Sequence, residues 1–130
     1  MPSSLSSSNQ KVAVVTGSSS GIGFETSLTL ARNGFLTYAT MRNLGKGATI
    51  QSVATKEGLP IRVVQLNVTE ERSINDAIHS IKSDVGKIDV LVNNAGYGLN
   101  GAFEDLAMEE IKAQFETTTW YLFRLPCALC

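Results

Sequence analysis

Residues 11–23 have the sequence KVAVVTGSSSGIG, in which an apolar run leads into a glycine-rich turn. Residues 12–15 are small or β-branched and apolar, as in a strand that is buried on both faces. Glycine permits backbone conformations that other residues avoid, and it lets the backbone come close to a ligand. A helix that starts in such a turn points free N–H groups and the positive end of its dipole at an anion. The segment therefore predicts a strand, a turn and a helix that together can bind a pyrophosphate.

Strand-like and helix-like segments alternate from residue 11 to about residue 117. The pattern predicts strands over 12–15, 35–41, 61–66 and 88–92 and helices over 22–33 and 44–56, with a third helix that Thr69 caps and Gly86 ends. Strands that are separated by helices imply right-handed crossovers and a parallel sheet. The predicted fold class is a doubly wound α/β domain.

Four short motifs carry a resemblance to a known family. They are the glycine-rich turn Thr16–Gly23, Leu66-Asn67-Val68, Asn93-Asn94-Ala95-Gly96 and Phe115-Glu116-Thr117. In this order and spacing they resemble the short-chain dehydrogenase/reductase family over residues 11–117. The sequence of residues 38–42 and 97–98 is similar to that of the subgroup of 17β-hydroxysteroid and retinol dehydrogenases. The resemblance implies the N-terminal, cofactor-binding half of a Rossmann NAD(P)-binding fold, and a parent oxidoreductase that transfers hydride between nicotinamide and a carbonyl or secondary alcohol.

The resemblance also implies which residues contact the dinucleotide. Asn67 stands where the family usually has an aspartate against the adenine, so an acceptor is kept and a charge is lost. The glycine-rich segment could instead be a tight turn without a ligand, and residues 93–96 could be a turn that Asn side chains stabilise. The implied cofactor-binding residues are Gly17, Ser19, Ser20, Gly21, Ile22 and Gly23 in the first turn, Asn67 and Val68 after the third strand, and Asn93, Ala95 and Gly96 after the fourth.

Arg42 indicates which dinucleotide is preferred. A fold that prefers NAD places an acid about 20 residues past the glycines to bind the ribose 2′-hydroxyl, whereas an arginine there accommodates a 2′-phosphate. This chain has Met41 and Arg42 after the second strand and no acid nearby. Because a guanidinium binds phosphate through charge-assisted hydrogen bonds, NADP(H) is predicted over NAD(H). The alternative is a solvated surface arginine.

The family's catalytic residues are not found in this chain. The resemblance implies a tyrosine four residues before a lysine, but none of Tyr38, Tyr97 and Tyr121 has a lysine at that distance. The family's catalytic serine is expected on a fifth strand, which has no counterpart here. We therefore predict no catalytic residue and no activity of this chain alone. The alternative is a non-catalytic dinucleotide-binding or interaction module.

The two ends of the chain differ from the rest. Residues 1–10 contain five serines and are expected to form a flexible tail. Residues 118–130 depart from the family pattern, which suggests that a frame change, alternative junction or cloning scar replaced the catalytic half. Finding no Tyr-x-x-x-Lys segment in any frame downstream of codon 118 would remove this hypothesis. Cys127, Cys130 and the distant His79 are too few for a structural zinc site, so no metal is expected.

Composition narrows the possible partners and location. The 130 residues carry a net charge of −1, so no basic surface for nucleic acid is predicted. The sequence has neither the apolar run of a signal peptide nor one that would span a membrane, so a cytoplasmic location is expected. The fourth strand should lie at a sheet edge with unpaired backbone groups. Besides the dinucleotide, the expected partner is therefore a second copy or a full-length copy of the protein.

Overall fold

The computed structural model describes residues 10–95 and 108–109. Most of the predicted serine-rich tail, Gly96, and the whole segment 118–130 lie outside the described residues. The elements are β1 (Val12–Val15), α2 (Gly21–Arg32), β2 (Leu36–Met41), the 3-10 turn η1 (Leu44–Gly47), α3 (Ala48–Glu57), β3 (Ile61–Gln65), α4 (Glu71–Val85) and β4 (Val90–Val92).

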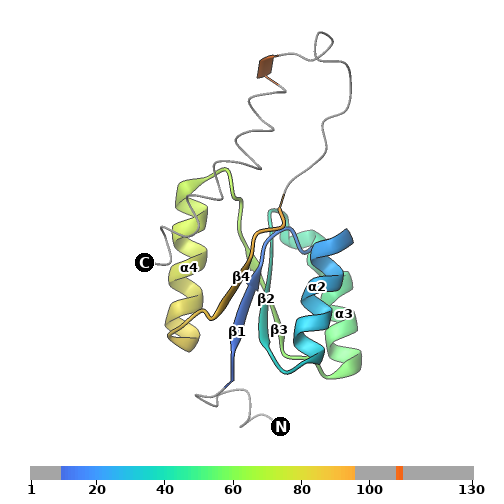
Figure 1. Cartoon of the computed structure of the whole chain (residues 1–130). Coiled ribbons are helices and arrows are strands. Elements are labelled where there is room, and N and C mark those ends of the chain that lie inside the picture. The colour runs from blue at the N-terminus through green and yellow to red at the C-terminus, as the bar shows by residue number, and fades with distance from the viewer. Residues whose placement is uncertain (1–9, 96–107, 110–130) are drawn as a thin grey trace.

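The four strands form one parallel sheet in the order β3-β2-β1-β4. Helices α2 and α3 cover one face of the sheet and α4 covers the other (Figure 1). Right-handed crossovers require this division, because the chain moves from β1 to β3 in one direction and returns past β1 to reach β4. The doubly wound α/β fold is therefore confirmed.

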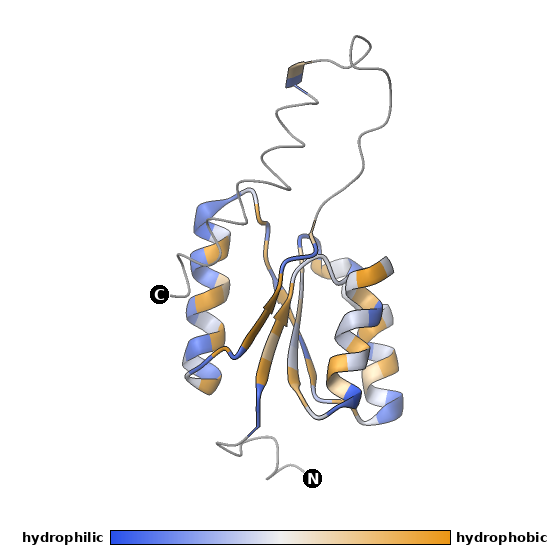
Figure 2. Cartoon of the chain, viewed as in Figure 1, coloured by the Kyte–Doolittle hydropathy of each residue, from blue (hydrophilic) through white to orange (hydrophobic). Residues whose placement is uncertain are grey.

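Both faces of the sheet are packed with apolar side chains. β1 and β2 are buried along their whole length, which agrees with their continuous apolar or β-branched sequences. Figure 2 shows hydrophobic residues along the strands and on the helices beside them. Two clusters fill the α4 face, namely Leu66, Val68, Ile74, Ala77 and Ile78, and Val12, Val14, Leu36, Tyr38 and Ile81; a third, of Leu28, Ala39, Met41 and Ile50, fills the α2 and α3 face.

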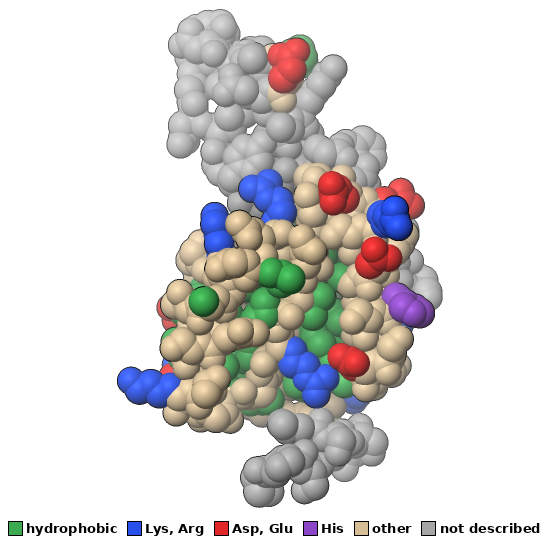
Figure 3. All heavy atoms as spheres, turned by 180° about the vertical axis from the view of Figure 1, so that it is seen from behind, with side chains coloured by type: hydrophobic (Ala, Val, Ile, Leu, Met, Phe, Trp, Pro, Cys, Tyr) green, Lys and Arg blue, Asp and Glu red, His purple; other side chains and the backbone are tan. Residues whose placement is uncertain are grey.

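β3 is an edge strand of the described sheet and is only partly covered. Ile61, Val63 and Val64 are half-buried. From behind, hydrophobic side chains remain visible between the two helical layers, with charged side chains around them (Figure 3). Arg62 of β3 lies over the ring of Tyr38, 5.8 Å from its centroid, and donates a 3.1 Å hydrogen bond to its hydroxyl. Burial, more than any neighbouring charge, raises the pKa of Tyr38.

Three sequence predictions differ from the structure. The first is the helix over 44–56, which is divided into η1 and α3. Asn43 accepts a hydrogen bond from the backbone N–H of Gly45, which stabilises the short turn before the helix. Gly47 is buried, and a Cβ there would lie 3.0 Å from Cγ1 of Val63. The two glycines thus serve a tight turn that packs against β3, and the α-helix begins only at Ala48.

The second is Thr69 as the N-cap of the third helix. The N-cap is Glu70, and no side chain caps it. The Thr69 hydroxyl instead donates to Oδ1 of Asn67, at 2.7 Å. The prediction was wrong because Asn67 accepts from both the N–H and the hydroxyl of Thr69, which holds Thr69 in the preceding turn, one residue before the N-cap.

The third is the start of the fourth strand, which was predicted at residue 88 and lies at Val90. The reason is Asp89, whose carboxylate accepts a 2.7 Å hydrogen bond from the N–H of Val12. Its own N–H donates to the carbonyl oxygen of Val12. The side chain of Asp89 therefore takes one of the two hydrogen bonds at this point, and the paired residues of β1 and β4 start at Ala13 and Val90.

The Asp89 contact makes stability depend on pH. The hydrogen bond from Val12 and the nearby ammonium of Lys87 hold the pKa of Asp89 below its usual value. A lowered folded-state pKa adds stability above the unfolded-state pKa, and this stability is lost as the pH falls through the folded-state value.

We therefore expect Asp89→Asn to lower the melting temperature at pH 7, and the difference from wild type to shrink as the pH falls through the folded-state pKa of Asp89, where the wild-type carboxyl takes up a proton. Thermal unfolding followed by circular dichroism from pH 2 to pH 8 would measure both. Asp76→Asn, on the exposed side of α4, is the matched control. A constant difference between Asp89→Asn and wild type over this pH range would contradict the assignment.

Candidate functional site

The glycine-rich turn connects the carboxyl end of β1 to the start of α2. Gly17 and Gly21 have φ values of 66° and 63°, in the left-handed region that favours glycine. Ser20 is the N-cap of α2, but its side chain makes no capping hydrogen bond. The first helical N–H groups have no partner within a helix, and the first turn of α2 contains no acid. The turn therefore offers several hydrogen-bond donors in a positive electrostatic field, which suits an anion.

A second turn, after β4, is bonded directly to the glycine-rich turn. The hydroxyl of Thr16 accepts hydrogen bonds from the N–H groups of Asn94, at 2.9 Å, and Ala95, at 3.0 Å. Nδ2 of Asn94 donates to the carbonyl oxygen of Gly17 at 3.1 Å. Residues nearly 80 positions apart thus form one rigid unit at the carboxyl edge of the sheet.

The close approach of these turns explains two of the glycines. A Cβ on Gly17 would lie 2.8 Å from Cα of Ala95, and one on Gly23 would lie 2.1 Å from the carbonyl oxygen of Gly17. Neither position has room for a side chain. Around Gly21, by contrast, nothing lies within 4 Å of such a Cβ. Gly17 and Gly23 thus allow close packing, whereas Gly21 supplies a backbone conformation and leaves open space where a ligand could lie.

Buried hydroxyl groups hold the glycine-rich turn against β1 and β2. Ser18 and Ser27 are fully buried, and Oγ of Ser27 donates to Oγ of Ser18 at 3.2 Å. Oγ of Ser18 in turn donates to the carbonyl oxygen of Val15. The same oxygen accepts from Oγ1 of Thr40, and the N–H of Ser18 donates to the carbonyl oxygen of Thr40. These bonds fix the turn to β2 and leave the hydroxyl groups of Ser19 and Ser20 available.

Arg42 follows β2 at the same edge of the sheet. Its side chain is exposed, and no ion pair or hydrogen bond of its guanidinium is found within residues 10–95. Arg32 and Arg62, in contrast, are paired with Glu57 and Asp84. Met41, which precedes Arg42, is buried. Within residues 10–95, Arg42 is therefore a cation without a carboxylate partner, and it follows β2 at the edge where the glycine-rich turn follows β1.

Asn67 and Val68 follow β3. Val68 is buried against α4, and Asn67 is half-buried in a turn that its own side chain stabilises. The N–H of Asn67 donates to Oγ of Ser73 at 2.8 Å. Both residues lie at the carboxyl edge of the sheet, where open α/β sheets bind their ligands.

The predicted residues are therefore brought to one edge of the sheet by four successive strand ends. The glycine-rich turn, Arg42, the pair Asn67 and Val68, and the pair Asn93 and Ala95 follow β1, β2, β3 and β4 respectively. Oδ1 of Asn93 is buried and has no hydrogen-bond partner in the described part of the chain. Gly96 was predicted with them but lies outside the described residues.

Sequence reasoning missed two residues that hold this edge together, Thr16 and Asn94. Both stand inside motifs that were recognised, at the first position of the glycine-rich turn and the second position of Asn93-Asn94-Ala95-Gly96. The available signal was a polar side chain close after each of two apolar strands, namely Thr16 after β1 and Asn94 after β4. Nothing in the sequence shows that these two groups meet.

Comparisons with known proteins agree with this geometry. The family model of short chain dehydrogenases matches residues 11–125. The chain belongs to the short-chain dehydrogenase/reductase family. Within this family it is 37% identical over 123 residues to retinol dehydrogenase 8 of Bos taurus, covering 92% of this chain and 39% of that protein. It is 34% identical over 119 residues to the 3-oxoacyl-[acyl-carrier-protein] reductase FabG of Escherichia coli, covering 92% and 48%.

Solved structures of family members show the same fold. An actinorhodin polyketide ketoreductase with NADPH is 28% identical, with a TM-score of 0.89, over 95% of this chain and 47% of that one. A metagenomic short-chain oxidoreductase in complex with NADP is 27% identical, with a TM-score of 0.86, over 95% and 57%. The chain thus spans about half the length or less of these relatives, and the part it shares is the Rossmann half that binds NAD(P).

Within the residues that the structure describes, no three His, Cys, Asp or Glu side chains gather as they would around a metal ion. No helix in those residues is long and apolar enough to cross a membrane. His79 lies on the exposed side of α4. Cys127 and Cys130 lie outside the described residues.

The bonds to Thr16 predict a specific stability effect. We expect Thr16→Val to lower the free energy of unfolding by about 1–3 kcal/mol, because the N–H groups of Asn94 and Ala95 lose their acceptor. Thr16→Ser keeps the hydroxyl and should lose much less. Urea unfolding of the three proteins would measure this difference. Equal losses in both variants would contradict this account, because Thr16→Ser removes only the methyl group and keeps the acceptor for both N–H groups.

Proposed function

We propose that this chain binds NADP(H), in preference to NAD(H), at the edge formed by the four strand ends. The observation that carries the proposal is Arg42, which lies beside the glycine-rich turn and has no carboxylate partner in residues 10–95. The phosphate of a ribose attached to a pyrophosphate at the turn would lie toward β2, where Arg42 stands. Buried Met41 takes the place where an acid would bind a 2′-hydroxyl. The ketoreductase and the metagenomic oxidoreductase, whose structures hold NADPH and NADP, support this assignment.

The dinucleotide would be held mainly by this chain's backbone and hydroxyl groups. N–H groups at the start of α2 and the side chains of Ser19 and Ser20 would bind the pyrophosphate. Ile22 is 77% exposed beside them and offers an apolar contact. Asn93 and Ala95 would line the other side of the groove, after β4. When bound, the nicotinamide would supply the hydride that the family transfers.

For the whole protein we propose hydride transfer between nicotinamide and a carbonyl or secondary alcohol, as in the family. For this chain alone we propose no turnover, because it has no tyrosine four residues before a lysine to exchange a proton with the substrate oxygen. The boundaries at residues 10 and 117 and the cytoplasmic location remain predictions from the sequence.

The cofactor preference predicts a titration result. In calorimetric titrations, wild type should bind NADPH more tightly than NADH. Arg42→Ala should weaken NADPH binding by about 10- to 100-fold, since a charge-assisted hydrogen bond contributes about 1.5–3 kcal/mol, and should leave NADH binding nearly unchanged. Arg72→Ala, an exposed arginine on α4, is the control. Equal weakening of both nucleotides, or none, would contradict the role of Arg42 in phosphate recognition.

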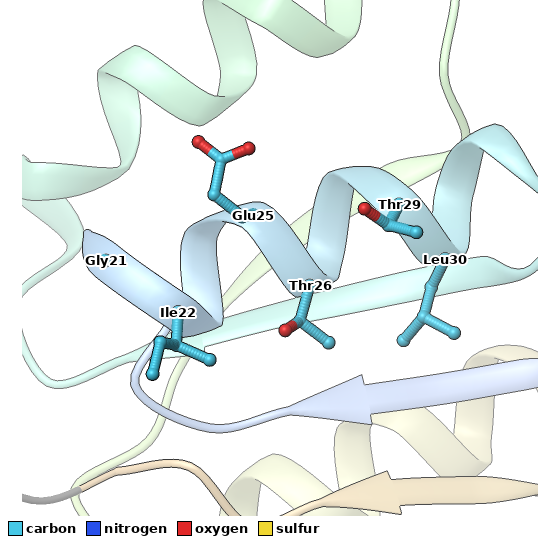
Figure 4. Close-up of a pocket in the computed structure, with 6 residues that line it drawn as sticks. All are labelled: Gly21, Ile22, Glu25, Thr26, Thr29 and Leu30. Carbon is cyan, nitrogen blue, oxygen red and sulfur yellow. The ribbon is translucent and has the colours of Figure 1, made fainter.

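A second candidate function, an interaction module, has a specific observation in its favour. In the described residues β4 pairs with β1 alone, so one side of it is an open edge. A hollow of about 610 Å³ is lined by Gly21, Ile22, Glu25, Thr26, Thr29 and Leu30 of α2. Ile22, Thr26 and Leu30 point to one side of the helix and Thr29 points away from them (Figure 4). An open edge beside a mostly apolar helix side favours association with a second copy of the chain.

This candidate predicts a change in oligomeric state. Sedimentation of wild type should show dimers, and the double variant Thr26→Lys, Leu30→Lys should shift the chain toward monomers by charge repulsion across the contact. Thr29→Lys adds a single lysine on the other side of α2 and should leave the dimer intact. A monomeric wild type, or an equal effect of Thr29→Lys, would rule out this surface.

A further inference from the structure

Asn67 lies next to the place that the base of a bound dinucleotide would take. This inference rests on the proposed function. The glycine-rich turn, Arg42 and Asn67 follow β1, β2 and β3, which are neighbours in the sheet. In the adenosine half of a dinucleotide, the pyrophosphate, the ribose and the base are joined in that order. If the pyrophosphate lies at β1 and the ribose phosphate at β2, the base comes to the end of β3. This placement uses only the strand order and the connectivity of the nucleotide.

The side-chain oxygen of Asn67 is already fully used. Oδ1 accepts one hydrogen bond from the N–H of Thr69 at 3.0 Å and another from Oγ1 of Thr69 at 2.7 Å. A backbone N–H can only donate, so the atom that accepts from it is the oxygen and not the nitrogen of the amide. An amide oxygen has two lone pairs, and both are engaged.

The rest of the residue is held in the same turn. The N–H of Asn67 donates to Ser73, and its carbonyl oxygen accepts from the N–H of Glu70 at 3.0 Å. The residue is half-buried. Nδ2 remains, and no group within residues 10–95 accepts a hydrogen bond from it. Asn67 can therefore contact a ligand through a donor only.

A donor at this place has a chemical consequence for the base. Adenine carries an amino donor on C6, whereas a 6-oxopurine carries a carbonyl acceptor there. A carboxylate in the same turn would use one oxygen for Thr69 and keep the second to accept from the amino group. The amide has only N–H groups left, which can donate to a carbonyl oxygen or a ring nitrogen of either base but cannot accept from an amino group. We infer that Asn67 sets base selectivity and that this chain does not select the 6-amino group of adenine.

The inference is tested by titrating the full chain with two probes. They are NADPH and its deaminated counterpart, in which hypoxanthine replaces adenine. For wild type we expect the deaminated dinucleotide to bind as tightly as NADPH, within about twofold, or more tightly. Asn67→Asp should bind NADPH about fivefold more tightly than the deaminated form, because one hydrogen bond is worth about 1 kcal/mol. The ratio of the two affinities cancels the effect of the added charge, which both probes meet equally.

A second variant keeps the asparagine. Thr69→Val removes the hydroxyl that occupies one lone pair of Oδ1 and leaves the N–H of Thr69 in place. The freed lone pair can then accept from the amino group, so the ratio should move toward NADPH, by about twofold. This variant also tests the inference if Asn67→Asp does not fold, which circular dichroism would show.

The outcomes separate this inference from the proposed function. A wild type that prefers NADPH by fivefold or more would overturn the inference, as would variants whose ratio equals that of wild type. In both cases NADPH still binds, so the proposed function stands. Failure of wild type to bind either dinucleotide would overturn the proposed function and the inference with it.

Discussion

The hydroxyl group of Thr16 connects the turn after β1 to the turn after β4. It accepts hydrogen bonds from the N–H groups that follow β4, and Asn94 returns a bond to the backbone that follows β1. A glycine-rich turn is intrinsically soft, because glycine has many accessible conformations. Here the turn is restrained by hydrogen bonds to residues that follow nearly 80 positions later in the sequence. The N–H groups that could bind an anion are therefore held in part by the turn after β4, in addition to the bonds that fix the glycine-rich turn to β2.

The two faces of the sheet contribute differently to this arrangement. On the α4 face, the core clusters run from β1 and β2 to β3 and α4 and are made of large apolar groups. On the other face, α2 approaches the sheet through Gly23, Ser27, Leu28 and Ala31, and three of these four are small. Small residues let the start of α2 lie against the turn and β4. The α4 face thus supplies most of the hydrophobic stabilisation, while the α2 face supplies precision at the site.

Periodicity and turn residues predicted the order and type of nearly all elements, because β1, β2 and α4 have sequences that suit only one environment. The failures were local. Thr69 lies in a local turn with Asn67 and not at the helix end, which the residue types alone do not decide. Asp89 binds the N–H of Val12, which depends on the two strands lying side by side. The site residues were found through motifs, but their mutual contacts were not. A hydrogen bond between positions 16 and 94 leaves no periodic signal, so only the assembled sheet reveals it.

The position of β1 between β2 and β4 also has a consequence for folding order. β1, β2 and β3 are joined by short crossovers, whereas β1 meets β4 only after a loop of 77 residues has closed. Contacts between distant residues form late, because the entropy lost in closing the loop precedes any gain. β4 is thus expected to join a preformed three-stranded unit, an order that hydrogen-exchange labelling during refolding would show directly. During synthesis, the glycine-rich turn would leave the ribosome long before Asn94, and its bonds to the turn after β4 would form only when that residue arrives.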